Sequence, residues 1–341
     1  MTIAPGTGQE DTGAILEAAE TAAIDGAVAI KGRTPWQIVW GRLKRDKVTM
    51  VALIASSLMI LLAILSPLLA HFGIIDPDLN HPDLVTGLGS LPEGFGGGMS
   101  LEHWLGVEPG TGRDIFARIL TGLTTSLTVA ILATMISLLI GVILGIIAGF
   151  ARGRTDWWIS RFMDLVLSFP STLMLLSLQL ILVQLIADAM GQSASAAPPK
   201  LVFMVVVLGF FGFPQIARII RGQVLSLRER EFIEAAQSLG AKRGRLYFKE
   251  LLPHLWAPIL VFSTLIMPAN IAAEATLGFL GVGLNPPAAS LGSLLNASVN
   301  YALPDPAYFL FPGLAVFFVV LAFNLLGDGL RDALDPKSGR S

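Results

Sequence analysis

The sequence predicts an all-α membrane protein with six transmembrane helices. Of its 341 residues, 53% are hydrophobic and only 14% are charged, whereas soluble proteins carry about 25% charged residues. The hydrophobic residues also gather in long runs, and a helix needs about 20 mostly apolar residues to cross a bilayer. Backbone groups in lipid must form hydrogen bonds within their own segment, so we expect these runs to be helices.

Six runs reach the required length. They cover residues 49–70, 124–149, 162–187, 201–221, 255–281 and 307–327. Proline falls inside the third, fourth and fifth runs, at Pro170, Pro214, Pro258 and Pro268. Because proline removes a backbone hydrogen bond and crowds the preceding turn, we expect these three helices to be kinked.

Three glycines recur at every fourth position of the second run, at Gly141, Gly145 and Gly149. A glycine stripe lets another helix approach closely, which is how helices associate where lipid offers no hydrophobic drive. The sequence leaves open whether that neighbour belongs to this chain or to a partner.

Basic residues mark one side of the membrane, because lysine and arginine accumulate in cytoplasmic loops. The spanning runs divide the remaining segments between two sides of the membrane. Of the 23 lysines and arginines, all but three lie in the terminal tails and in the stretches 152–161 and 218–249, which share one side. The three on the opposite side are Arg113, Arg118 and Lys200. The sequence therefore predicts that both termini and the polar 222–254 segment are cytoplasmic.

The chain divides into one large domain and two short tails. Residues 1–35 begin with small, polar and acidic residues and lack a signal-peptide pattern, so we expect a mobile cytoplasmic tail. Residues 36–336 form the six-span domain, and residues 337–341 a short cytoplasmic tail. Trp36 and Trp40 stand among basic residues just before the first run. They suit a short helix in the headgroup layer or an extension of the first transmembrane helix.

Several kinds of chemistry are excluded or unsupported. The chain has no cysteine, which excludes disulfides and thiolate catalysis. Its four histidines are scattered without metal-ligand spacing. No Gly-x-x-x-x-Gly-Lys-Ser/Thr sequence occurs, so nucleotide is not expected to bind here. We predict no catalytic, cofactor or metal site, and no binding of nucleic acid.

The polar segment between the fourth and fifth runs is the most distinctive part of the chain. It reads EAAQSLGAKRGRLYFKELLP over residues 234–253. Ala235 and Ala236 favour a helix, while Gly240 can adopt a positive φ that ends it and allows a turn into a second helix. Pro253 suits the start of the next helix. The segment is therefore predicted to be a rigid helix-turn-helix.

This segment resembles the coupling loop of ABC-transporter permeases, and other motifs extend the resemblance to the second permease subunit of the dipeptide/oligopeptide/nickel importers. They are HWLGVEPGTGRDIFARILTG (103–122), DLVLSFP (164–170), IARIIRGQVLSLREREFIEAAQSLGA (216–241), EATLGFLGVGLNPP (274–287) and FPGLAVFFVVLAFNLLGDGLRDALDP (311–336). The sequence departs from the family at Leu251, where Ile is frequent, in Gly-Thr-Gly at 110–112 and in its long N-terminal tail. None of these departures falls on the coupling residues.

The resemblance implies the fold of a type I ABC importer permease in a prokaryotic cytoplasmic (inner) membrane. The expected partners are a second homologous permease subunit, two ABC ATPase subunits that bind the ATP, an extracytoplasmic solute-binding protein and the lipid bilayer. The coupling loop would span residues 228–253. Its residues that couple to the ATPase would be Glu234, Ala235, Ala236, Gly240, Leu252 and Pro253. The solute would be a di- or oligopeptide or, alternatively, nickel or another small solute.

Ionisable groups within spanning helices are rare and often functional. Glu274 in the fifth run either lines the solute path or packs near the outer interface or against a neighbouring helix. Asn324 and Asp328 near the end of the sixth run are expected to fix helix packing and the exit to the cytoplasm. Asp164 follows Arg161 by three residues, so we expect a local ion pair.

Two other functions are weighed against an importer subunit. A proton-coupled secondary transporter working through Glu274 and Asp164 would be expected to show inverted repeats, and none is visible. An intramembrane enzyme needs a nucleophile and base or a metal cluster within the membrane, and no histidine falls within a run. The sequence therefore favours a permease subunit that is not itself an enzyme.

Overall fold

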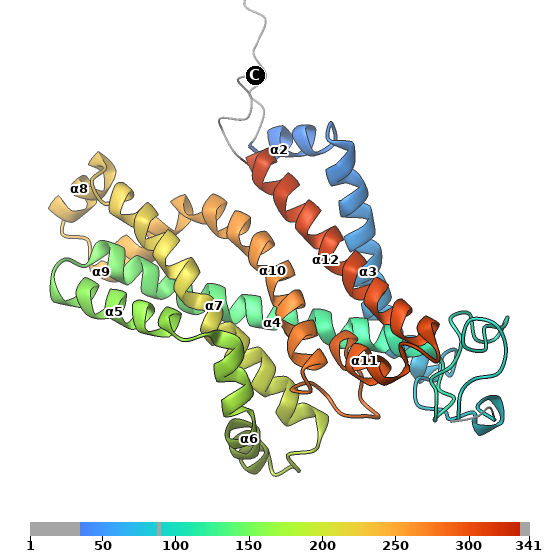
Figure 1. Ribbon diagram of the computed structural model, residues 1–341. Helices are drawn as coiled ribbons and strands as arrows, with labels where there is room; N and C mark the ends of the chain where they lie inside the picture. Colours follow the sequence, from blue (N-terminus) through green and yellow to red (C-terminus); the bar gives the residue numbers. More distant parts are fainter. Residues whose placement is uncertain (1–34, 87–89, 335–341) are drawn as a thin grey trace, which may run out of the picture. The chain divides into compact units, whose positions relative to one another are not determined.

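The computed structural model describes residues 35–86 and 90–334, and these residues are almost wholly helical (Figure 1). The longer helices are α2 (Pro35–Leu43), α3 (Lys47–His71), α4 (Ile115–Phe150), α5 (Arg154–Ser168), α6 (Ser171–Met190), α7 (Ala197–Leu227), α8 (Glu231–Ser238), α10 (Trp256–Phe279), α11 (Leu291–Ser298) and α12 (Pro306–Leu334). Shorter turns are η1 (Pro82–Leu84), α9 (Arg243–Arg245), η2 (Leu246–Leu251), η3 (Leu252–His254) and η4 (Val299–Tyr301). The all-α prediction is confirmed.

Six of the described helices, α3, α4, α6, α7, α10 and α12, are long and apolar enough to cross a membrane. This number agrees with the six predicted runs. The second helix begins at Ile115 rather than near residue 124, because the Asp114 carboxylate accepts a hydrogen bond from the Ala117 N–H at 2.7 Å and caps it there.

The prediction of one kinked helix over residues 162–187 is wrong. The structure divides this stretch between α5, which ends at Ser168, and α6, which starts at Ser171. Phe169 between them has extended backbone angles (φ −87°, ψ 132°), as expected for a residue whose helical conformation is blocked by a following proline. Pro214 and Pro268, by contrast, lie inside the continuous helices α7 and α10.

The chain separates into two compact units, one ending at Arg42 and one beginning at Leu43. In the first unit the structure describes only residues 35–42, which belong to α2. This helix ends at Leu43, and Asp46 caps a new helix by accepting from the Val48 N–H, so α2 is not an extension of α3. Residues 1–34 and 335–341 lie outside the described residues, and the predicted domain bounds and mobile tails stay predictions.

Helices α4 and α7 form the most extensive helix pair of the second unit. A Cβ atom on Gly141 would lie 2.7 Å from Cβ of Ile216, and one on Gly145 would lie 2.8 Å from the carbonyl oxygen of Ala217. Gly149 faces α7 in the same way. The glycine stripe therefore serves a neighbour within this chain, which answers the question left open by the sequence.

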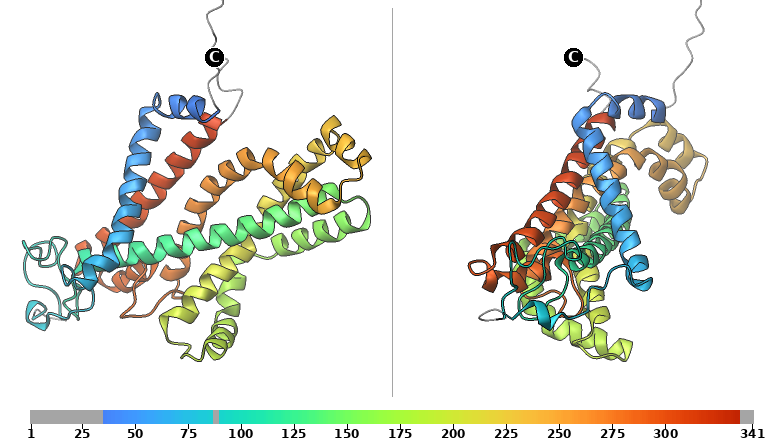
Figure 2. Two further views of the ribbon diagram at one scale, coloured as in Figure 1. Left: turned by 180° about the vertical axis from the view of Figure 1, so that it is seen from behind. Right: turned by 90° about the vertical axis from the view of Figure 1, so that its right-hand side faces the viewer.

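Helices α3, α4, α10 and α12 pack together in a second group (Figure 2). Their buried side chains include Ala63, Leu127, Ile271 and Phe323, one from each helix. Gly327 of α12 allows close contact with α10, because a Cβ atom there would lie 2.8 Å from the Thr264 carbonyl oxygen.

The segment between α3 and α4, residues 72–114, is tied to the helices by buried polar groups. Glu108 forms an ion pair with Arg118 of α4 at 2.5 Å and accepts a hydrogen bond from the Tyr308 hydroxyl of α12 at 3.2 Å. Arg118 also donates to the carbonyl oxygen of Pro287 at 3.1 Å. This network joins four separate parts of the chain at the end of the bundle opposite α8 (Figure 1).

Candidate coupling site

The polar segment that follows α7 folds into a helix-turn-helix, as predicted. Its first arm is α8, and Gly240 in the turn has φ +76°, a conformation that glycine adopts without steric cost. The second arm is not one regular helix, because α9 is followed by a π-helical turn, η2, and a 3₁₀ turn, η3, before α10 begins. Figure 1 shows this segment projecting at one end of the bundle.

The coupling loop, residues 228–253, is anchored through the fully buried side chain of Ile233 on α8. Ile233 packs with Ile220 and Val224 of α7 and with Leu251 and Leu255 of the second arm. Arg228 adds a polar anchor by donating to the Gly149 carbonyl oxygen at 3.0 Å. A displacement of α8 must therefore be carried to the closely packed α4–α7 pair.

The predicted coupling residues lie mostly on the exposed side of this loop. Glu234, Ala235, Gly240 and Pro253 are exposed, and Ala236 and Leu252 are half-buried. The Glu234 carboxylate has no hydrogen-bond or ion-pair partner among the described residues. Leu239 is 89% exposed. Both side chains are therefore accessible to a partner.

A cavity of about 590 Å³ opens between the two arms of the loop. Its walls include Phe232 and Ala236 from α8, Leu239 and Lys242 from the turn, and Arg245 and Glu250 from the second arm. Arg245 and Glu250 are 3.6 Å apart and form an ion pair. The cavity thus has apolar and charged walls and can receive a side chain from a partner.

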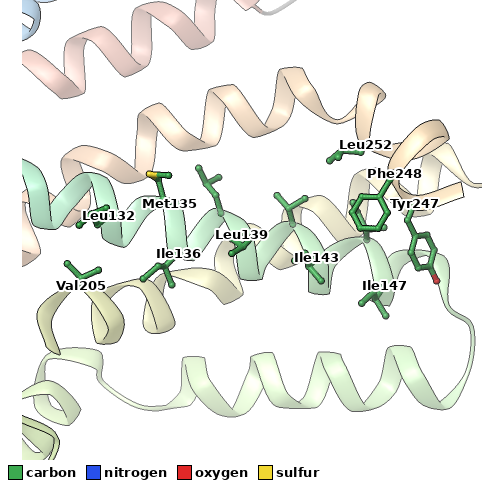
Figure 3. A pocket seen from close by; sticks show the side chains of 13 residues that line it. Leu132, Met135, Ile136, Leu139, Ile143, Ile147, Val205, Tyr247, Phe248 and Leu252 are labelled. Carbon is green, nitrogen blue, oxygen red and sulfur yellow. The ribbon is translucent and has the colours of Figure 1, made fainter. Parts of the chain in front are cut away.

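An apolar groove of about 790 Å³ connects this loop with the middle of α4 (Figure 3). Leu132, Met135, Leu139 and Ile143 line it along α4. Tyr247, Phe248 and Leu252 of the second arm close its other end (Figure 3). Leu252 therefore contributes to both the coupling loop and the groove.

Glu274 of α10 is fully buried. The hydroxyl groups of Ser126 on α4 and Ser290 before α11 lie against its carboxyl group, yet neither carboxylate oxygen has a partner at hydrogen-bonding geometry. The residue lies where α4, α10 and α11 meet, and its role in packing or on the solute path stays a prediction.

Asn324 and Asp328 lie one turn apart on α12 and are both exposed. Neither side chain has a hydrogen-bond or ion-pair partner among the residues the structure describes. The backbone of Gly327 between them makes the close contact with α10, and Asn324 lines a groove between α10 and α12.

Two carboxylates join α5 to α7. Asp164 pairs with Arg161 at 3.3 Å, as predicted, and also with Arg218 of α7 at 2.5 Å. Asp156 accepts two hydrogen bonds from Arg221 at 2.6 and 2.7 Å. The Arg221 guanidinium holds the pKa of Asp156 below its ordinary value, although partial burial acts in the opposite direction.

A family described as binding-protein-dependent transport system inner membrane component matches residues 141–340. The chain belongs to this family. The N-terminal TM domain of oligopeptide transport permease C matches residues 34–85. The permease thus carries both family regions, and the prediction of an ABC importer permease subunit is confirmed.

Two relatives cover almost the whole permease. The dipeptide transport system permease protein DppC of Alkalihalophilus pseudofirmus is 38% identical over 89% of this chain and 90% of its own. The glutathione transport system permease protein GsiD of Escherichia coli is 36% identical over 89% and 91%. A solved structure of the MetNI methionine ABC transporter, in inward-facing form, matches with TM-score 0.48 and 17% identity over 63% of this chain and 97% of that one.

The permease is a multi-pass membrane subunit of an ABC importer and works with ATPase and binding-protein partners. Among the described residues no cluster of three or more histidine, aspartate or glutamate side chains could hold a metal ion. The sequence reasoning missed the anchoring residues Ile233 and Arg228. Ile233 was detectable in principle, because with Phe232 and Ala236 it forms the apolar face of an otherwise polar helix.

Proposed function

We propose that the coupling loop binds an ABC ATPase subunit and transmits its movement to the transmembrane helices. The observation that carries this proposal is the combination of an exposed outer side and a buried anchor. Glu234 and Leu239 face outward without partners in the described chain, while Ile233 packs against α7. A partner that holds the exposed side can therefore pull on α7 and, through it, on α4.

The remaining subunits are proposed from the family to which the permease belongs. ATP is bound and hydrolysed by two ATPase subunits, so this chain itself is not an enzyme and needs no cofactor. A second homologous permease subunit completes the path, and the groove along α4 offers an apolar surface for it, with Met135 and Leu139 exposed. The proposed orientation places the coupling loop and both termini in the cytoplasm, and the α3–α4 segment on the side of the solute-binding protein.

The proposed solute is a di- or oligopeptide, because the names of two relatives refer to dipeptide and glutathione transport. We place a polar path for the solute along α12, beside Asn324 and Asp328. Polar side chains in spanning helices rarely face lipid, and these two are exposed without partners among the described residues. A carboxylate at 328 suits the ammonium group of a peptide.

The coupling proposal can be tested by replacing glycine with tryptophan at two positions. Gly240 in the coupling loop and Gly191 after α6 both follow the end of a helix with a positive φ, +76° and +64°, and a Cβ atom on either would meet nothing within 4 Å. A substitution therefore meets the left-handed backbone penalty at both positions. We expect Gly240→Trp to abolish co-purification of the ATPase and uptake, and Gly191→Trp to retain both.

Equal ATPase binding and uptake by the two variants would overturn the coupling assignment. The solute is tested separately, by mass spectrometry of the ligand that co-purifies with the binding protein of this importer. A peptide supports the proposal, whereas bound nickel or another non-peptide solute contradicts it.

A further inference from the structure

The break between α5 and α6 leaves an apolar groove at the elbow of the two helices. Its volume is about 410 Å³, and it is lined only by apolar side chains. Phe162 of α5, Phe169 at the break, Met174 of α6 and Phe210 of α7 are among them. Because α6 and α7 are long and apolar enough to cross a membrane, the groove faces hydrocarbon, and an acyl chain is the natural occupant.

Two exposed guanidinium groups lie just beyond one end of this groove. Arg161 precedes Phe162 on α5, and Arg218 lies two turns beyond Phe210 on α7. Their side chains are 63% and 51% exposed, and both contact the single carboxylate of Asp164. The cluster therefore keeps one net positive charge and several unused N–H donors directed to its surroundings.

Two neighbouring tryptophans indicate the depth of this cluster. Trp157 and Trp158 are both more than half exposed and lie one turn before Arg161 on α5. Exposed tryptophan side chains gather where the membrane meets water. The first turns of α5 then lie at the headgroup level, with Arg161 at the phosphates and Phe162 at the start of the hydrocarbon.

We propose that this elbow is a binding site for an anionic phospholipid. The phosphate is held by Arg161 and Arg218, and an acyl chain fills the groove beside Phe162, Phe169 and Phe210. Asp164 limits the affinity, because its carboxylate competes with the phosphate for both guanidinium groups. The lipid contacts α5, α6 and α7 together, and thus stabilises the packing of the helix that leads into the coupling loop.

The site can be tested with the intact transport complex in nanodiscs that contain both phosphatidylglycerol and phosphatidylcholine. Native mass spectrometry then measures which lipid the complex retains. We expect selective retention of phosphatidylglycerol. Arg161→Gln or Arg218→Gln should each lower this selectivity about fivefold, since one basic residue at an anionic surface contributes about that factor. Asp164→Asn should raise it.

The groove is tested by Met174→Trp, which fills it, against Leu180→Trp, an 82% exposed position on the same helix outside the groove. Only Met174→Trp should reduce the retained lipid. Equal retention of the two lipids, no opposite effects of the arginine and aspartate substitutions, or equal losses in both tryptophan variants would overturn the proposal. Displacement of phosphatidylglycerol by inorganic phosphate alone would also contradict it.

Discussion

The α3–α4 segment and the coupling loop both connect transmembrane helices, but the α3–α4 segment buries a charged pair, whereas the coupling loop also keeps unpaired charges at its surface. In the α3–α4 segment Glu108 is buried against Arg118, and Asp114 lies 2.8 Å from His103. In the coupling loop Glu234 and Lys242 are exposed and have no side-chain partner among the described residues. The difference teaches that charges paired within the chain stabilise the fold, whereas the unpaired ones remain available to a partner.

The largest effect is expected from breaking the buried ion pair of the α3–α4 segment. Arg118→Met leaves Glu108 buried without its counter-charge, and removal of one partner of a buried pair costs about 3–5 kcal/mol. We expect a marked fall in the melting temperature of the purified permease. Glu234→Ala should leave melting nearly unchanged, within about 0.5 kcal/mol, while reducing ATPase binding. Similar melting of both variants would contradict the distinction between the two regions.

The second prediction concerns the anchor of the coupling loop. Ile233→Ala removes a fully buried side chain and should weaken the packing of α8 by about 2–4 kcal/mol. Hydrogen exchange should then accelerate over residues 231–255, and ATP hydrolysis should no longer drive uptake. Gln237→Ala, at an exposed position on the same helix, is the control for hydrogen exchange. Unchanged exchange in the Ile233 variant would show that α8 is held by other contacts.

The third prediction compares two glycines that differ in their surroundings. Gly145→Ala places a Cβ atom 2.8 Å from the Ala217 carbonyl oxygen, and overpacking of this kind costs about 1–3 kcal/mol. At Gly222 on α7 a Cβ atom meets nothing within 4 Å, so Gly222→Ala should be neutral or slightly stabilising. Thermal melting of both variants measures the difference, and an opposite order would mean that the α4–α7 contact is not tight.

The smallest effect is pH-dependent. Arg221 lowers the pKa of Asp156 in the folded protein below its ordinary value of 3.8. The pair therefore stabilises the fold fully above about pH 4 and loses this contribution as pH falls through the lowered pKa. Asp156→Asn should destabilise the permease by about 1 kcal/mol near neutral pH, and the gap in melting temperature should narrow only below pH 4. A gap that is constant across this range would contradict the assigned ion pair.

The sequence predicted the six spanning helices well because lipid imposes a simple rule of length and apolarity. The prediction is wrong at residues 162–187, where the apolar run continues through Pro170 but the helical backbone is interrupted at Phe169. The sequence predicts one helix here because α5 is itself rich in apolar side chains. Hydropathy alone could not show that α5 packs beside α7 through Asp156 and Asp164.

The coupling loop was predictable for a different reason. Gly240 can be predicted from the sequence alone to end α8 and allow the turn. The Glu-Ala-Ala triplet can also be recognised without knowledge of tertiary contacts. The apolar face of α8 marks Ile233 as a residue to be buried. The sequence could not show that Ile233 packs against Leu251 or that Arg228 donates to Gly149, because these partners are distant in the chain. The surroundings of Glu274 were equally hidden, because Ser126 and Ser290 approach it from separate elements.

The most direct test of the coupling loop uses the absence of native cysteine. A single cysteine at Leu239→Cys, in the exposed turn of the loop, is compared with one at Leu303→Cys, which is 94% exposed just before α12. With a thiol-reactive cross-linker in membranes, we predict that Leu239→Cys is joined to the ATPase subunit and Leu303→Cys is not. Cross-linking of the ATPase through residue 303, or none through residue 239, would contradict the central claim.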